Sequence, residues 1–390
     1  MGYNQNQMEH GIYNQIADMP IITTTGWKKL NDVVTGDYVF DERGVPTEVI
    51  FCRTAPEPVY RVVLNKYVNM VVPGSWGFLT LTNKERSANL KRTPEYRDKR
   101  RANRKDKKIP KTNRRRPDLS NRNQNRVVDH LEHTSYSFRD FNEIALTLRD
   151  GRTKQNHSLS IHQQLVFPEN GDLLINPYVL GVWLGDGNSK DSSYTNNDPE
   201  IAQRIRNMGY SVKETPYTDR NASLFRIEGL LGDLKEIGVL GNKHIPENYL
   251  RSSFENRIEL LRGILDTDGY VDQRGSISFS LSHRPLALGT VELIRSLGIK
   301  CNIRQRKAKL YGVEKKDRFR MDFFTNLDVF SLSRHVDRLN SLDCDSRSKI
   351  RRTIWYVDEC NLGEVQEINH IKVAGNMILF GEHLVPVATS

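Results

Sequence analysis

Two apolar segments that each end in Asp-Gly constrain this chain most. Pro177 to Gly187 reads PYVLGVWLGDG, and Leu260 to Gly269 reads LLRGILDTDG. Each segment predicts a buried helix that stops at glycine. A carboxylate is unfavourable at the C-terminal end of a helix, because that end is already partially negative. A single copy would be a core helix with a glycine stop, but two copies call for a chemical explanation.

Small residues recur on one face of each predicted helix. Gly181 and Gly185 lie four residues apart in the first segment, and Gly263 and Thr267 take the corresponding places in the second. Small residues let two helix backbones approach closely. We therefore expect the two helices to pack against each other across a pseudo-twofold axis, which brings their final aspartates together.

The final aspartates of the two helices, Asp186 and Asp268, would form a site that is unstable until a hard cation fills it. Oxygen ligands carrying this charge favour Mg²⁺, with Mn²⁺ as a substitute. Bound cations can generate a hydroxide nucleophile and stabilise a leaving oxygen, as phosphodiester hydrolysis requires. The pair is therefore predicted to be catalytic and to bind metal.

Residues 175–350 read as a duplication, because each half continues from its Asp-Gly helix into strands, a helix, further strands and another helix. In the second half, polar and apolar residues alternate along three predicted strands. Ribbons with one polar face suit the DNA major groove, although an ordinary sheet with a solvated face is the alternative. The side chains expected to contact DNA here are Ser276, Ser278, Ser280, Asn302, Arg304, Arg306, Arg318 and Arg320.

Positive charge is concentrated in one segment of the chain. The net charge is +10, and between Lys84 and Arg126 there are 18 Lys and Arg against 5 Asp and Glu. This segment has too few apolar residues to bury a core, so a flexible or ligand-ordered arm is expected. Phosphate binding explains such charge density, and a solvated linker is the alternative. The arm residues expected to bind DNA are Lys99, Arg100, Arg101, Arg104, Lys105, Arg114, Arg115 and Arg116.

Both ends of the chain predict β structure. Residues 18–80 and 353–386 read as short strands with turn glycines, and the second set is too short to bury its own core, so we expect it to pair with the first. The 4 cysteines form no CxxC pair, which argues against a zinc ribbon or a disulfide framework. No apolar run reaches the ~18 residues of a membrane span, so the expected location is the cytoplasm of a phage-infected or bacterial host cell.

The two Asp-Gly segments resemble the signature helices of the LAGLIDADG homing endonucleases. This resemblance implies an α+β fold with a duplicated αββαββα core, DNA-binding saddle sheets, and a monomer that cuts double-stranded DNA at a long specific site. In that family the last acid of each motif binds the catalytic metals, which implies that role for Asp186 and Asp268. A basic residue follows the third helix of each half, and the matching positions are Lys243 in GNKHIPENYL and Lys349 in DSRSKIRR.

A second resemblance covers the chain ends. DMPIITTTGWKKLNDVVTGDYVFDERGVPTEV is similar to the opening of intein splicing domains of the Hedgehog/intein (Hint) type, and NHIKVAGNMILFGEHLVPVATS to their closing strands. Splicing in that family needs a Cys or Ser nucleophile, an internal histidine and a terminal His-Asn. Asn14, Trp76, Ala388 and Thr389 stand in those places, and none of them can perform the required chemistry. The resemblance therefore implies an intein-like domain that has lost splicing.

The combined prediction divides the chain into five parts. They are a Hint-like β domain over 12–82, a basic arm over 83–135, a connecting β segment over 136–174, an endonuclease domain over 175–350 and the rest of the Hint-like domain over 351–390. The expected function is site-specific double-strand DNA cleavage by a free-standing nuclease. The alternatives are an inactivated or engineered intein with an endonuclease insert, and a LAGLIDADG protein that binds DNA or RNA without cutting it.

Overall fold

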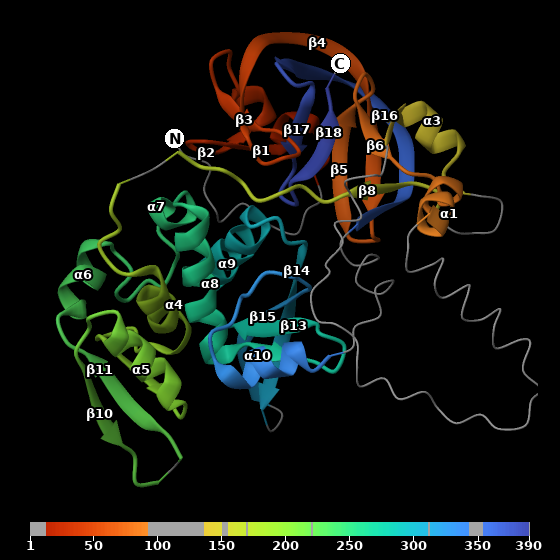
Figure 1. The fold of residues 1–390 in the computed structure, drawn as a ribbon. Coiled ribbons are helices and arrows are strands. Elements are labelled where there is room, and N and C mark those ends of the chain that lie inside the picture. Colours follow the sequence, from red (N-terminus) through yellow and green to blue (C-terminus); the bar gives the residue numbers. More distant parts are fainter. Residues whose placement is uncertain are drawn as a thin grey trace, which may run out of the picture.

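The computed structural model describes residues 13–92, 136–149, 155–168, 171–219, 221–310, 313–342 and 354–389. Two lobes are visible in Figure 1, a β lobe built from both ends of the chain and a mixed lobe built from residues 171–342. Within these ranges, none of the helices has the length and hydropathy that a membrane-spanning segment requires.

Strands from the two ends of the chain pair to form the β lobe. Strand β4 (Pro46–Leu64) runs antiparallel to β16 (Ile354–Val373), from Leu64 opposite Val357 to Val49 opposite Val373. The expectation that the C-terminal strands complete the N-terminal unit is confirmed. The expectation of uniformly short strands is wrong, because these two span 19 and 20 residues. Register shifts interrupt their pairing, and such bulges let a long ribbon bend around a core.

The sheet of the β lobe has the order β7-β6-β18-β17-β1-β3-β4-β16-β8, with β2 paired to β1 and β5 to β4. Its core contains the aromatic side chains of Trp76, Phe78, Phe141 and Phe380, each at most 1% exposed. The remaining elements of this lobe are η2 (Ile16–Asp18), β1 (Pro20–Thr23), β2 (Gly26–Lys29), η3 (Leu30–Asp32), β3 (Tyr38–Phe40), β5 (Val68–Pro73), β6 (Gly77–Thr80), α1 (Asn83–Arg92), β7 (Ser137–Asp140), α3 (Phe141–Leu146), β8 (Ser158–Ser160), β17 (Met377–Phe380) and β18 (Val385–Ala388).

The mixed lobe contains two runs of helices and strands in similar order. The first run forms a three-stranded sheet, β10-β11-β9, and the second a four-stranded sheet, β12-β13-β15-β14. The first run consists of α4 (Pro177–Asp186), β9 (Ser193–Asn196), α5 (Pro199–Asn207), β10 (Val212–Pro216), β11 (Ser223–Ile227) and α6 (Leu230–Glu236). Helix α7 (Glu247–Leu250) leads to the second run, which consists of α8 (Phe254–Asp268), β12 (Tyr270–Val271), β13 (Ile277–Leu281), α9 (Arg284–Ser296), β14 (Cys301–Leu310), β15 (Val313–Phe323) and α10 (Ser333–Asn340).

Helices α4 and α8 pack in the middle of the mixed lobe at backbone contact (Figure 1). A Cβ atom added to Gly181 would lie 2.3 Å from the carbonyl oxygen of Leu260, and one added to Gly263 would lie 2.2 Å from that of Tyr178. A Cβ on Gly185 would lie 2.1 Å from the Thr267 hydroxyl. The small residues therefore permit the close helix approach that the sequence predicted.

A buried arginine joins the two lobes. Arg257 on α8 is fully buried, and its guanidinium donates to the carbonyl oxygens of Ser252 at 3.0 Å, Ser296 at 2.8 Å and Leu165. Leu165 belongs to the segment that connects the lobes, and it packs in a cluster with Phe40 of the β lobe. Because a buried guanidinium must be satisfied by acceptors, this cluster holds the connecting segment against α8.

Candidate functional site

Local sequence fixes where helices α4 and α8 begin and end. The Asn176 side chain accepts from the first amides of α4, and Ser253 caps α8 by accepting from Asn256. Both helices end at glycine, where the chain passes close to the last turn. A Cβ on Gly187 would lie 2.2 Å from the Trp183 carbonyl oxygen, and one on Gly269 would lie 2.4 Å from that of Leu265. The Asp-Gly pairs therefore set the direction in which the chain leaves each helix.

Asp186 and Asp268 stand at adjoining helix ends. Burial, helped by the charge of Asp268, raises the pKa of Asp186 to about 6, against the opposing effects of a hydrogen bond from Asn196 and the charge of Lys243. Asn196 Nδ2 donates to Asp186 Oδ2 at 2.6 Å. Burial also raises the pKa of Asp268, against the favourable charges of Arg318 and Lys243. Two carboxylates that are costly to ionise together form a site that a cation would stabilise.

Lys243 lies beside this pair. Its side chain is buried, and Nζ donates to the carbonyl oxygens of Trp183 at 2.9 Å and Leu184 at 3.0 Å, in the last turn of α4. Burial lowers the pKa of Lys243 to about 8, while the charges of Asp186 and Asp268 favour its protonated form. A cation at this point offsets the partial negative charge of the helix end.

The second helix end has a different cation arrangement. Arg334 on α10 donates to the carbonyl oxygen of Asp266 at 3.4 Å. Asp266 itself is fully buried and accepts from Tyr178 Oη at 2.9 Å and Ser331 Oγ at 2.6 Å. The sequence analysis did not single out Arg334 or Asp266. Lys349, which it assigned to this half, lies outside the described residues.

Across the described ranges, no three His, Cys, Asp or Glu side chains gather into a metal-binding group. The ligands on offer are the two carboxylates of Asp186 and Asp268. This number suits Mg²⁺, which typically binds one or two carboxylates and takes further ligands from water and substrate phosphates. The donor set therefore fits a divalent cation that binds together with a phosphodiester.

The raised pKa of Asp186 leads to a stability prediction for the metal-free protein. The folded chain keeps this proton above pH ~4, where the unfolded chain has lost it. The Asp186 carboxyl therefore contributes fully to the free energy of unfolding below pH ~4, and this contribution is lost as the pH rises through about 6. We expect metal-free Asp186→Asn to be more stable than the wild type at pH 8, by on the order of 1–3 kcal/mol, in denaturant titrations.

This stability difference should shrink as the pH falls and vanish by pH ~2, where Asp186 is neutral in both states. Mg²⁺ at pH 8 should stabilise the wild type and not the variant. A wild type that is more stable than the variant at pH 8 in a chelator would contradict the assignment.

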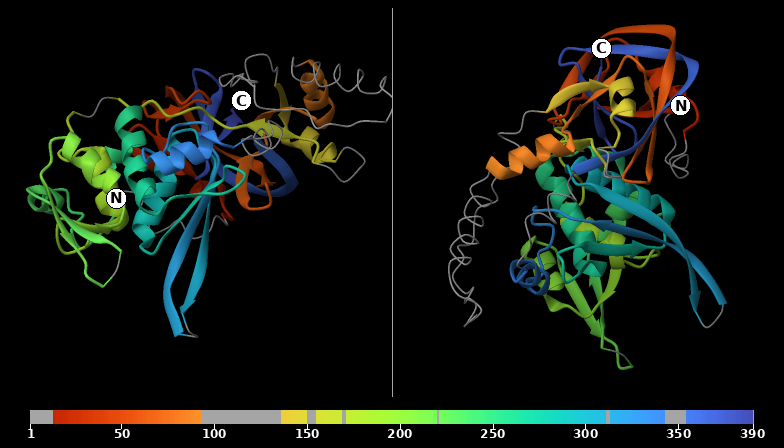
Figure 2. Two further views of the ribbon diagram at one scale, coloured as in Figure 1. Left: turned by 60° about the horizontal axis from the view of Figure 1, so that its bottom comes forward. Right: turned by 90° about the vertical axis from the view of Figure 1, so that its right-hand side faces the viewer.

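The predicted DNA-contacting side chains of the second half follow the register of one sheet. Ser280, Arg320 and Arg304 lie side by side on β13, β15 and β14, and Arg306 lies opposite Arg318. The β14–β15 ribbon projects from the lobe in Figure 2. The alternate residues of these strands, Ile277, Phe279, Phe319, Met321 and Phe323, are buried in the core.

Individual members of the predicted set differ in exposure. Arg304, Arg306 and Arg318 are exposed, and Asn302, Ser276 and Ser280 are half-buried. Ser278 is buried between β12 and β15, so it is poorly placed to contact a ligand.

The sheet of the first half also has a polar face, which the sequence analysis missed. Lys213 lies opposite Arg226, and Leu224 on the central strand lies between Thr215 and Thr195. The opposite face carries Phe225 and Tyr194, which pack in the core. The alternation is only five residues long on each of β10 and β11, which made it hard to recognise.

The expected basic arm begins as helix α1, and all of its predicted DNA contacts, from Lys99 to Arg116, lie outside the described residues. Arg86 on α1 donates to the carbonyl oxygens of Leu81 and Asn156, each at 2.7 Å. Its guanidinium also lies 5.3 Å from the ring centre of Tyr356. The start of the arm is thus held against the β lobe.

The four positions assigned to lost splicing chemistry lie in the β lobe. Asn14 is exposed and accepts from Arg61 at 3.2 Å. Trp76 is 1% exposed and packs edge to face with Phe380, their ring centres 5.2 Å apart. Ala388 pairs with Gly77, the neighbour of Trp76, and Thr389 donates its amide to Asn376. Trp76, Ala388 and Thr389 are thus buried in a packed core, whereas Asn14 lies at the surface.

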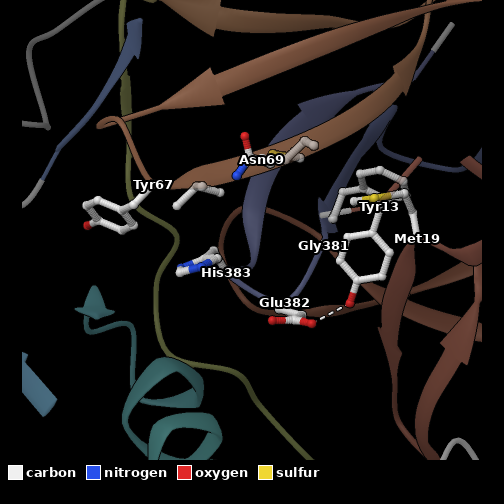
Figure 3. A pocket seen from close by; sticks show the side chains of 10 residues that line it. Tyr13, Met19, Tyr67, Asn69, Gly381, Glu382 and His383 are labelled. Carbon is white, nitrogen blue, oxygen red and sulfur yellow. Dashed lines mark hydrogen bonds between the residues drawn. The ribbon is translucent and has the colours of Figure 1, made fainter. Parts of the chain in front are cut away.

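A small cavity lies in the β lobe (Figure 3). It is lined by Tyr13, Tyr67, His383 and neighbouring residues, and the Tyr13 hydroxyl donates to Glu382. Its volume of about 20 Å³ is room for about one water molecule. The lining includes no residue of α4 or α8, so the cavity is separate from the aspartate pair.

A comparison with protein-family models finds a match in the mixed lobe. Residues 244–346 match the homing endonuclease family model, a range that contains α8, Asp268 and the β14–β15 ribbon. The chain is 33% identical over 323 residues to the replicative DNA helicase DnaB of Mycobacterium intracellulare, covering 81% of this chain. The chain spans about half of that relative, 48% of its length.

Solved structures give weaker similarities. I-DmoI in complex with DNA and Mn is 13% identical, with a TM-score of 0.29, and the match covers 43% of this chain and 94% of that one. The MchDnaB-1 intein is 27% identical, with a TM-score of 0.16, over 17% of this chain and 52% of that one. The family match therefore identifies a homing endonuclease domain over residues 244–346 of this chain.

Proposed function

We propose that this chain is a site-specific double-strand DNA endonuclease that uses Mg²⁺ or Mn²⁺ bound between Asp186 and Asp268. The observation that carries this proposal is the proximity of two carboxylates, half-buried Asp186 and exposed Asp268, at helix ends that glycine contacts bring together. The homing endonuclease match over residues 244–346 supports it. When bound, the metal would supply a nucleophilic hydroxide and neutralise charge on the leaving oxygen.

The protein's own groups would position and stabilise the reacting phosphodiester. Asn196 orients the Asp186 carboxylate through its hydrogen bond. Lys243 holds a positive charge beside the pair, where it would stabilise negative charge that develops on the scissile phosphate. During hydrolysis a water oxygen forms a bond to phosphorus while the bond from phosphorus to the leaving oxygen breaks.

The finer architecture belongs to the same proposal. The two runs of elements would form a pseudo-twofold LAGLIDADG core whose two sheets make a saddle for duplex DNA. The polar faces of both sheets support this arrangement. One face carries Arg304 and Arg320, and the other carries Lys213 and Arg226. The proposal also includes the domain boundaries predicted from the sequence, a monomeric state, and contacts between the basic arm and DNA.

Cleavage of a randomised DNA library tests this function. The purified chain should produce double-strand breaks within one long sequence when Mg²⁺ or Mn²⁺ is present, and sequencing of the ends should locate both cuts. A chelator should abolish the breaks. Specific binding without breaks would favour the alternative of a DNA-binding protein that does not cut.

Lys243→Ala should slow the cleavage step by about 10²-fold while changing DNA affinity little, the scale expected when a transition-state charge partner is lost. Single-turnover rates at saturating DNA would measure the step. Lys300→Ala is a matched control, because Lys300 is half-buried and its amine also donates to a backbone carbonyl, that of Ile354, away from the pair. A defect confined to binding would make Lys243 a phosphate anchor instead.

We further propose that the intein-like β lobe does not splice. Asn14 has neither thiol nor hydroxyl, and Thr389 cannot cyclise to release a chain as asparagine does. Placed between two reporter domains, the chain should neither ligate them nor cleave its own backbone, as judged on denaturing gels and by mass spectrometry. A ligated reporter product would refute this part of the proposal.

A further inference from the structure

Four arginines occupy neighbouring positions on one face of the second sheet. Arg304 on β14 lies opposite Arg320 on β15, and Arg306 lies opposite Arg318 in the next row. The face behind them is apolar and buried, so these guanidiniums are confined to the open face. The sheet therefore presents two adjacent rows of paired arginines on a projecting ribbon (Figure 2).

This arrangement works against the stability of the sheet itself. Like charges directly opposite each other across an antiparallel pair are destabilising. Within the described residues, Asp322 pairs with one of the four, its carboxylate lying 3.1 Å from Arg320 Nε. A ligand that offers hydrogen-bond acceptors to several guanidiniums at once would relieve the repulsion.

We propose, on the basis of the proposed endonuclease function, that the half of the target site lying under this sheet is rich in guanine. Arginine pairs through two hydrogen bonds with O6 and N7 of guanine in the major groove, which a two-stranded ribbon can enter. Two rows on one face lie ~7 Å apart along a strand, close to two base-pair steps of ~3.4 Å. The rows of Arg304 and Arg306 are thus spaced to meet guanines two steps apart.

The first sheet has a different chemistry on its corresponding face. Arg226 lies opposite Lys213, and beside them lie Thr215, Leu224 and Thr195. Threonine and apolar side chains contact the thymine methyl group, so the first sheet offers guanine one basic row, Lys213 with Arg226, against two rows of arginine pairs on the second sheet. The two halves of the target should therefore differ in composition.

Selection of binding sites from randomised duplexes, in a chelator to prevent cutting, tests this inference. The wild type should enrich guanines clustered in one half of the site. Arg304→Ala should reduce the preference for one of these guanines by roughly 10- to 100-fold. Arg304→Lys should do the same while retaining more affinity, because lysine keeps the charge but loses the two-bond geometry.

Arg226→Ala in the first sheet is the matched control and should leave the guanine cluster unchanged. A selected and cleaved site without guanines in either half would overturn the inference and leave the endonuclease function standing. Equal loss of affinity of Arg304→Ala for all sequences would also overturn it, since phosphate contacts carry no sequence information. Failure to bind any DNA would instead overturn the proposed function.

Discussion

Asp186→Asn and Asp268→Asn should each abolish DNA cleavage in Mg²⁺ while leaving DNA binding nearly intact. Each change removes one of the two charged ligands offered to the cation. The chemical step should therefore be lost while the contacts to DNA remain. The loss should exceed the roughly 10²- to 10³-fold seen when a single electrostatic stabiliser is removed. Single-turnover cleavage and a separate binding titration on the selected site would measure the two effects.

The control for this pair is Asp328→Asn, which changes an exposed aspartate of the same lobe. It should cut at the wild-type rate. Wild-type cleavage by Asp186→Asn or Asp268→Asn would show that the altered aspartate is not part of the site. Loss of binding together with cleavage would indicate that the pair contacts DNA directly.

Gly263→Ala should destabilise the mixed lobe strongly. Its added Cβ would lie 2.2 Å from the Tyr178 carbonyl oxygen and 2.8 Å from the Val182 nitrogen, and both are backbone atoms of a buried helix. Helices α4 and α8 would have to move apart, at a cost at the upper end of the roughly 1–3 kcal/mol typical of overpacking, or above it. Denaturant titration would measure the loss, and cleavage should fall because the aspartates separate.

Gly232→Ala provides the comparison for this substitution. Gly232 lies in helix α6, and a Cβ added there would meet no atom within 4 Å. Alanine is favoured over glycine in a helix by about 1 kcal/mol, so this variant should be slightly more stable than the wild type. Equal effects of the two substitutions would contradict backbone contact between α4 and α8.

The central helices and their aspartates could be predicted because their signals are local. The glycine spacing of Gly181 and Gly185 implied helix contact, and the alternation on β14 and β15 implied one polar face. Lys243 was found by resemblance to a family motif, and its burial against the end of α4 gives that assignment a physical basis.

Other features have no signal in the sequence. Arg257 reads as an exposed charge on an amphipathic helix, but it is buried, because its acceptors are backbone carbonyls on distant segments. Asn196 and Arg334 likewise meet the helix ends only through tertiary structure. The pairing of the two chain ends was expected, but the register of β4 against β16, such as Leu64 opposite Val357, has no local signal.

Anomalous diffraction from a crystal of the DNA complex grown with Mn²⁺ would test the central claim most directly. The account predicts an anomalous peak in contact with both Asp186 and Asp268 and with an oxygen of the scissile phosphate. Cleaved DNA in the crystal with Mn²⁺ bound elsewhere, and no peak at the aspartate pair, would contradict it.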